Sequence, residues 1–205
     1  MKDKFCIKLL LILFFAHCLK LEEVCDQKFE MLEAKKMLPN LFNISYIIEN
    51  TQNYNFFKIE LKETLQKGIG IFSTRRIASN RTILYYKLKI FDGKNYTAFD
   101  NFKYSFIVID NETGQHDRTR VADIFIDSNQ KPRGRKPFWG YLINEPDENQ
   151  NENVKVYLDQ TKYDTEIGNI LVYKMVTKAI IEPGEEITWC YGNSYERNYK
   201  TNCIF

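Results

Sequence analysis

Cysteine and histidine are scarce in this chain, and those present are poorly spaced for a metal site. The 205 residues include 5 cysteines, none in a Cys-x-x-Cys pair, and 2 histidines. His17 and His116 lie at no ligand spacing from the cysteines or from each other. Structural zinc sites draw on closely spaced Cys and His ligands. We therefore expect no structural zinc site and assign no metal ligand.

An excess of charge of one sign is also lacking. The sequence has 29 Lys and Arg against 27 Asp and Glu, a formal net charge of +2. No global basic field indicates nucleic acid, so any such contact would have to be local. Hydrophobic residues make up 44% of the chain and aromatic residues 15%, which is enough for a packed core. The length predicts one domain, or one domain with a short extension.

Long hydrophobic runs are absent apart from one near the N-terminus, over residues 9–15 (LLLILFF). This run is too short to span a bilayer. It follows Lys2 and Lys4, and residues 16–18 offer small side chains of the kind that a signal peptidase reads. Residues 1–18 therefore match a secretory signal peptide in outline, with a hydrophobic N-terminal helix as the alternative. Four Asn-x-Ser/Thr sequons are compatible with secretion but are also expected by chance in an Asn-rich chain, at Asn43, Asn80, Asn95 and Asn111.

Residues 19–55 form an N-terminal extension in this interpretation. Apolar residues recur near helical spacing from Leu21 to Leu38, and Pro39 follows, so we expect a helix over 21–38. Residues 40–55 are rich in Asn and are expected to be a loop with an apolar patch at 44–48.

From Phe56 onward the pattern changes to short strands and irregular loops. Lys67–Gly70 predicts a tight turn, and residues 111–120 predict a charged turn region. The expected strands cover residues 56–62, a segment starting at 71–72, then 82–90, 104–109, 121–126 and 170–181. Because long helices do not alternate with these strands, a doubly wound sheet with a dinucleotide site is excluded. The fold class is α+β and mostly β, with an N-terminal helix.

Three segments between residues 67 and 195 fit a single pattern. They are Lys67–Phe72 (KGIGIF), Trp139–Pro146 (WGYLINEP) followed by Asn153, and Ala179–Tyr195 (AIIEPGEEITWCYGNSY). In order and spacing they resemble the motifs of the SET-domain protein lysine methyltransferases. The resemblance covers residues 56–195, and a short tail, residues 196–205, follows. It implies several small sheets with a knot-like C-terminal segment.

The resemblance also implies a cofactor, S-adenosyl-L-methionine, and a place for it. In the family, the glycine-rich turn cradles the cofactor through main-chain groups, and glycine lets the backbone approach a ligand closely. The Asn of the second motif contacts the cofactor as well. The resemblance assigns cofactor binding to Gly68, Ile69, Gly70, Phe72, Tyr141, Asn144 and Glu145.

Glu145 departs from the family, which commonly has His at this position. The family residue is often engaged through its backbone, and in one interpretation Glu145 serves in the same way. In the other, an acid beside the amino-acid part of the cofactor weakens binding of the cofactor's carboxylate. The tail departs too, because many SET enzymes carry a cysteine-rich zinc-binding segment after the catalytic tyrosine, and residues 196–205 do not.

Tyr191 is implied to be the catalytic residue, because a phenol oxygen there can orient the methyl group and the amine. Glu186 is expected to hold the backbone near Tyr191. Trp189 falls where the family has an aromatic residue that limits how many methyl groups fit, and it predicts a narrow channel and mainly monomethylation. A core indole is the alternative. Tyr195 is a further candidate for the substrate channel.

The segment from Lys131 to Pro137 (KPRGRKP) resembles an AT-hook, in which Arg133 and Arg135 would lie in an A·T minor groove. A solvated basic loop that meets an acidic substrate is the favoured interpretation, and DNA binding is the alternative.

The first functional hypothesis is a protein-lysine methyltransferase that acts on a histone tail or another basic protein, in the nucleus or cytoplasm. The second is a SET-like interaction module without catalysis. The third is a secreted glycoprotein with coincidental motifs, which would follow residues 1–18 into the secretory pathway.

Overall fold

The computed structural model describes residues 39–52, 54–98, 103–110, 112–125, 132–164 and 168–204. The hydrophobic run over 9–15 and the helix expected over 21–38 lie outside these residues. Within them, no helix is long and apolar enough to cross a membrane.

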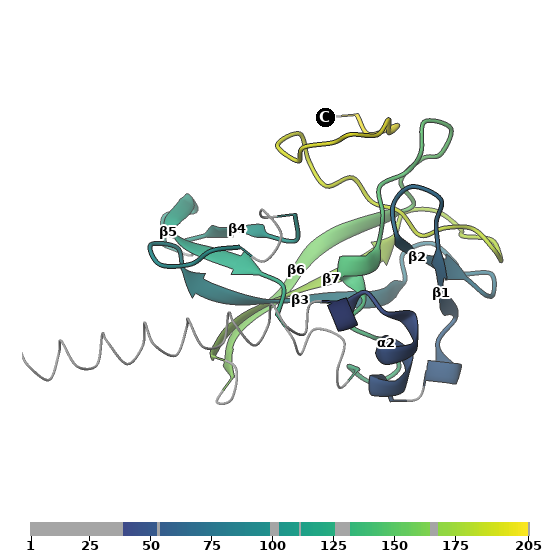
Figure 1. The fold of residues 1–205 in the computed structure, drawn as a ribbon, viewed down its shortest axis with the longest axis horizontal. Coiled ribbons are helices and arrows are strands. Elements are labelled where there is room, and N and C mark those ends of the chain that lie inside the picture. Colours follow the sequence, from purple (N-terminus) through teal and green to yellow (C-terminus); the bar gives the residue numbers. More distant parts are fainter. Residues whose placement is uncertain are drawn as a thin grey trace, which may run out of the picture.

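Two antiparallel sheets make up the domain (Figure 1). The smaller sheet pairs β1 (Ile59–Glu63) with β2 (Ile69–Ser73). The larger sheet has the order β4-β5-β3-β7-β6. Its strands are β3 (Thr82–Asp92), β4 (Phe106–Ile109), β5 (His116–Asp123), β6 (Val154–Asp164) and β7 (Gly168–Thr177). The mostly β architecture is the one predicted from the sequence.

The segment expected to be a loop contains a helix, α2 (Ile44–Asn50), followed by a short 3-10 helix, η1 (Tyr54–Phe56). Asn43 caps α2, because its side-chain oxygen accepts a hydrogen bond from the backbone N–H of Tyr46 at 3.0 Å. Ile47 is fully buried against the sheet core. The loop prediction was wrong because it did not recognise Asn43 as a helix N-cap or Ile47 as a core residue.

Two further differences concern strands. The charged region at 111–120 was expected to be a turn, but β5 begins at His116 and pairs with β3 and β4. Its first residues are mostly exposed, so a charged sequence is compatible with this strand. Strand β6 was not predicted. It pairs with β7 over almost its full length and forms one edge of the sheet.

The core lies where the two sheets, α2 and the short helix η2 (Gly140–Leu142) meet. Trp139 is completely buried there, and its ring contacts Tyr54 and Phe57 at centroid distances of 5.4 Å each. Burial of such large apolar side chains provides most of the driving force for folding. This core fixes residues 139–145 at the centre of the molecule.

The C-terminal part of the chain passes between two other segments. On one side, the N–H of Ile187 donates to the carbonyl of Ile71 in β2 at 2.7 Å. On the other side, Thr188 forms a parallel bridge with Asn144. After this crossing, residues 192–204, called the tail from here on, leave the sheets and lie at the top of the view in Figure 1 (yellow). The knot-like arrangement expected from the resemblance is thus present.

Candidate functional site

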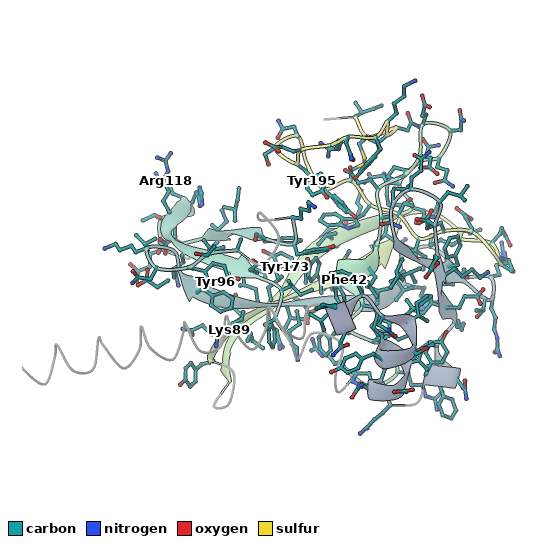
Figure 2. All side chains as sticks on the ribbon, in the orientation of Figure 1. Phe42, Lys89, Tyr96, Arg118, Tyr173 and Tyr195 are labelled. Carbon is teal, nitrogen blue, oxygen red and sulfur yellow. A yellow bond between two sulfur atoms is a disulfide. The ribbon has the colours of Figure 1, made fainter. Side chains whose placement is uncertain are left out.

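The three motifs meet around one pocket of about 1010 Å³. Side chains from distant parts of the chain line it, and Figure 2 shows two of them, Phe42 beside α2 and Tyr195 on the tail. Seven of the residues that the sequence singled out line this pocket: Gly68, Ile69, Tyr141, Asn144, Trp189, Tyr191 and Tyr195. The pocket is therefore the candidate site, and all three sequence motifs contribute to its lining.

Tyr191 is held by both its backbone and its hydroxyl. The hydroxyl donates a hydrogen bond to the carbonyl of Ile143 at 2.6 Å, and the backbone N–H donates to Oε1 of Glu145 at 2.8 Å. The tyrosine is thus pinned at two points to the segment that carries the second motif. The phenol oxygen keeps its acceptor capacity for a ligand, because its one proton points to Ile143.

Burial raises the pKa of Tyr191 well above its ordinary value, and the neighbouring Tyr199, Tyr195 and Glu145 raise it further. The phenol is therefore neutral at physiological pH. It can orient a reacting group through hydrogen bonds, but it is not a phenolate base.

Aromatic rings form one side of the pocket. The ring of Tyr191 packs edge-on against Tyr195 at a centroid distance of 4.8 Å and in a tilted arrangement against Trp189 at 5.2 Å. Trp189 stacks on Phe106 at 5.8 Å, and Phe106 contacts Tyr86 at 5.1 Å. Aromatic faces attract cations and accommodate methylene chains. This wall suits a long aliphatic side chain that ends in an amine.

The glycine-rich turn presents one glycine to the pocket and buries the other. A Cβ atom at Gly68 would have no neighbour within 4 Å, and its φ of +69° favours glycine. A Cβ atom at Gly70 would lie 2.6 Å from Oε1 of Glu186 and 3.0 Å from Nδ2 of Asn144. Gly68 and Ile69 line the pocket, whereas Gly70 provides space for the packing behind it.

Phe72 does not line the pocket. It lies in β2, where its backbone forms a bridge with Glu186 and its ring lies 5.3 Å from Nζ of Lys62.

Asn144 connects the second motif to the other two. Its Nδ2 donates to Oε1 of Glu186 at 3.0 Å and to the carbonyl of Ile69 at 3.3 Å. Burial raises the pKa of Glu186, while the Asn144 hydrogen bond and the charge of Lys67 oppose this shift. The acid expected to hold the backbone near Tyr191 therefore fixes the side chain of Asn144 instead.

Asn153, the later Asn of the resemblance, secures the same crossing. Its Oδ1 accepts from the N–H of Thr188 at 2.9 Å, and its Nδ2 donates to the carbonyl of Glu186 at 2.7 Å.

Glu145 is completely buried and does not line the pocket. Its carboxylate faces the tail, where Nε of Arg197 lies 2.7 Å from Oε2. Tyr199 donates to Oε2 at 3.0 Å. The sequence treated Glu145 as a neighbour of the cofactor, but the structure places it as the anchor of the tail.

The tail also carries a disulfide, Cys190–Cys203, with a Cα–Cα distance of 5.7 Å. Neither this bond nor the role of Arg197 was predicted from the sequence. The signal for the disulfide was a second cysteine that follows the tyrosine motif at a separation of 13 residues. Arg197 gave no such signal, because its partner lies 52 residues away.

The basic segment at Arg133 folds into a tight turn rather than an extended strand. Arg133 bridges to Lys136 across Gly134, and its guanidinium pairs with Asp159 and lies 4.9 Å from the ring centre of Tyr85. Arg135 lies over the ring of Phe56 at 5.3 Å. Both arginines contact protein groups, and DNA binding by this turn stays a prediction.

Comparison with known proteins places these features in one family. Residues 68–192 match the family model of the SET domain. A comparison with curated protein sequences gives no match.

Solved structures that resemble the chain include a Plasmodium falciparum protein assigned as a histone methyltransferase, at 19% identity and a TM-score of 0.43. That alignment covers 68% of this chain and 96% of the other. Another is the ATXR5 SET domain in complex with a di-methylated histone H3, at 13% identity and a TM-score of 0.44. It covers 71% of this chain and 62% of that one.

These structural likenesses are distant, and the assignment comes from the family match. That match spans more than half of the sequence and includes the core of all three motifs. The chain therefore belongs to the SET-domain family.

Proposed function

We propose that this protein is an S-adenosyl-L-methionine-dependent protein-lysine N-methyltransferase that acts on a histone or another basic protein. The observation that carries the proposal is the placement of Tyr191. Its neutral phenol is anchored to Ile143, beside an aromatic wall, in a pocket that also contains the open glycine turn. SET-domain methyltransferases generally use this cofactor.

The residues present fit such a cofactor. The open side of Gly68 leaves backbone accessible where a side chain would block it, as a close-fitting ligand requires. Gly68 and Ile69 would hold the cofactor from the turn, and Tyr141 and Asn144 from the second motif. When bound, S-adenosylmethionine supplies a methyl group activated by a sulfonium.

The chain itself contributes alignment rather than acid–base chemistry. Tyr191 offers its oxygen lone pairs to the reacting groups while its hydroxyl proton is donated to the carbonyl of Ile143. Trp189 and Tyr195 line the pocket and would confine the target side chain between them. Correct orientation of two reacting groups supplies about 7–11 kcal/mol of a barrier in favourable cases. The target amine loses its proton to solvent before it reacts, because Tyr191 is not a base.

The aromatic wall also supports the substrate class. Lysine combines a four-carbon stem with a cation, and aromatic rings attract both. A basic protein with an exposed lysine on a flexible tail would enter the pocket between the tail and the aromatic wall.

Two measurements on the full-length protein test this function. Calorimetry with S-adenosylmethionine should show saturable binding with a stoichiometry of about one. Labelled cofactor with mixed core histones should then transfer the label, and hydrolysis of the product should yield methyllysine. Saturable binding without transfer to any basic protein would favour a SET-like interaction module. Absence of both would contradict the proposal.

A further inference from the structure

Glu145 occupies an unusual position for an acidic side chain. It is completely buried, and four hydrogen-bond donors surround its carboxylate. Oε1 accepts from the N–H of Tyr191 and from Nη2 of Arg197, each at 2.8 Å. Oε2 accepts from Nε of Arg197 at 2.7 Å and from Tyr199 at 3.0 Å. A buried carboxylate is tolerated only when it is paired and hydrogen-bonded in this way.

Arg197 extends this cluster along the tail. It donates through Nη1 to the carbonyl of Tyr195 at 2.6 Å and through Nη2 to the carbonyl of Gly192. Its guanidinium also lies 5.3 Å from the ring centre of Tyr195. One side chain thus fixes the backbone of the tail at two points and orients a pocket-lining ring. The hydrogen bonds that Arg197 donates to the Glu145 carboxylate are charge-assisted and hold the guanidinium in this position.

The tail is a wall of the pocket rather than a free end. Six consecutive residues, Ser194–Tyr199, line the pocket. Beyond them, Thr201 donates to the carbonyl of Pro146 at 2.7 Å, and Asn202 donates to the carbonyl of Gln150 at 2.9 Å. Removal of this wall would open the aromatic side of the pocket to solvent.

We propose that Glu145 is the positioning residue of the site. Through Arg197 it latches the tail over the pocket, and through the N–H of Tyr191 it sets the position of the tyrosine. This role rests on the proposed function only in its kinetic consequence, since the latch itself is a structural statement. It replaces the interpretation in which Glu145 faces the cofactor and weakens cofactor binding.

The two interpretations predict opposite effects of neutralising the charge. Glu145→Gln keeps the size of the side chain but replaces one acceptor oxygen with an NH₂ donor. That donor would meet the donors of Arg197, Tyr199 or Tyr191, because all four partners of the carboxylate are donors. If Glu145 is a latch, the variant loosens the tail. If Glu145 opposes the cofactor, the variant tightens cofactor binding.

The experiment compares wild type, Glu145→Gln and a matched control, Glu148→Gln. Glu148 is exposed and pairs with Lys200 on the same tail at 3.4 Å, so its variant removes a charge next to the tail without entering the cluster. Hydrogen exchange measured by mass spectrometry reports on the tail directly. Amides of residues 192–204 should exchange at least about tenfold faster in Glu145→Gln than in wild type or the control.

Kinetics and calorimetry supply the second measurement. The value of kcat/KM for the protein substrate should fall about 100-fold in Glu145→Gln, because displacement of a reacting group by about 1 Å costs that much. The Kd for S-adenosylmethionine should stay within about threefold, as expected if the carboxylate makes no contact with the cofactor. If Glu145→Gln does not fold, Tyr199→Phe removes one hydrogen bond of the cluster and should shift exchange in the same direction by a smaller factor.

Failure of the latch and failure of the proposed function give different results. Faster tail exchange in Glu145→Gln supports the latch even if the wild type transfers no methyl group. That combination of results contradicts the proposed methyltransferase function but not the latch. Tail exchange equal to wild type overturns the latch, and so does tighter cofactor binding, whether or not the wild type is active.

Discussion

Removal of the Cys190–Cys203 disulfide should destabilise the protein and release the end of the tail. The bond joins the residue before Tyr191 to the end of the tail across a separation of 13 residues. It therefore limits the freedom of this loop in the unfolded chain. For a loop of this length the chain-entropy relation gives about 3 kcal/mol at 25 °C.

The predicted loss in free energy of unfolding converts to a measurable shift in Tm. In domains of 150–250 residues, 1 kcal/mol changes Tm by about 2–4 °C. The double variant Cys190→Ser/Cys203→Ser should therefore melt about 6–12 °C below the wild type. Both cysteines are changed together so that no free thiol remains to form other bonds.

Thermal unfolding followed by circular dichroism measures this shift, with the intact mass under non-reducing conditions to confirm the bond. Wild type treated with a dithiol reductant should melt like the double variant, and reductant should not affect the variant. A double variant that melts within about 1 °C of the oxidised wild type would refute the argument. In that case the contacts of Glu145, Thr201 and Asn202 would suffice to hold the tail.

Two further predictions concern pH and the degree of methylation. Burial raises the pKa of Tyr191, Tyr86 and Tyr141 in the folded protein, so their contribution to stability is complete below pH of about 10 and is lost as pH rises beyond it. Because the tyrosines stay neutral, the pH dependence of the reaction should follow the target amine. The value of kcat/KM should rise about tenfold per pH unit between pH 7 and 9 as that amine is deprotonated, and a decrease of kcat/KM at any pH between 7 and 10 would contradict this. Wild type should yield mainly monomethyllysine because Trp189, stacked on Phe106, narrows the channel, and Trp189→Phe should increase the share of di- and trimethyllysine. Mass spectrometry of the product measures the shares of mono-, di- and trimethyllysine. If wild type yields mainly trimethyllysine and Trp189→Phe gives the same distribution, the steric account is contradicted.

The disulfide also bears on the location of the protein. The reducing nucleus and cytoplasm keep thiols unpaired, whereas oxidising compartments preserve disulfides. On this chemistry we propose a secretory location, the alternative raised by residues 1–18, as a hypothesis to test beside the nucleus or cytoplasm. The three sequon asparagines in the described part of the chain, Asn43, Asn80 and Asn95, are exposed. A secretory location would point to a basic protein other than a nuclear histone as the substrate.

The fold class followed from the sequence because short alternating strands and turn residues are local signals. β3 was predicted close to its true limits, since a run of apolar and β-branched residues marks it, whereas β7 was predicted to continue four residues beyond its end at Thr177. Strand β5 was shortened in the prediction because its charged first residues resemble a turn. Its pairing with β3 and β4 is a tertiary effect that a local pattern does not contain.

In the candidate site, too, residues with a local sequence signal were predicted and residues defined by tertiary contacts were not. Tyr191, Asn144 and Gly68 belong to motifs with fixed local spacing, and the structure brings them to one pocket. The partners of Glu145 could not be predicted, because Arg197 reaches it across 52 residues through a crossing of two segments. The acid at position 145, where the family commonly has His, was the one local sign that another part of the chain must pair with this side chain, as Arg197 does.

The central claim is that Tyr191 orients the reacting groups in a lysine-methylating site, and Tyr191→Phe tests it most directly. The variant removes only the hydroxyl that donates to Ile143, while the ring contacts remain possible. Tyr157→Phe is the matched control, because Tyr157 is exposed on the edge strand β6. Under single-turnover conditions with saturating cofactor, Tyr191→Phe should transfer methyl groups at least about 100-fold more slowly than wild type and control, with similar cofactor Kd. Equal transfer rates in all three proteins would contradict the account.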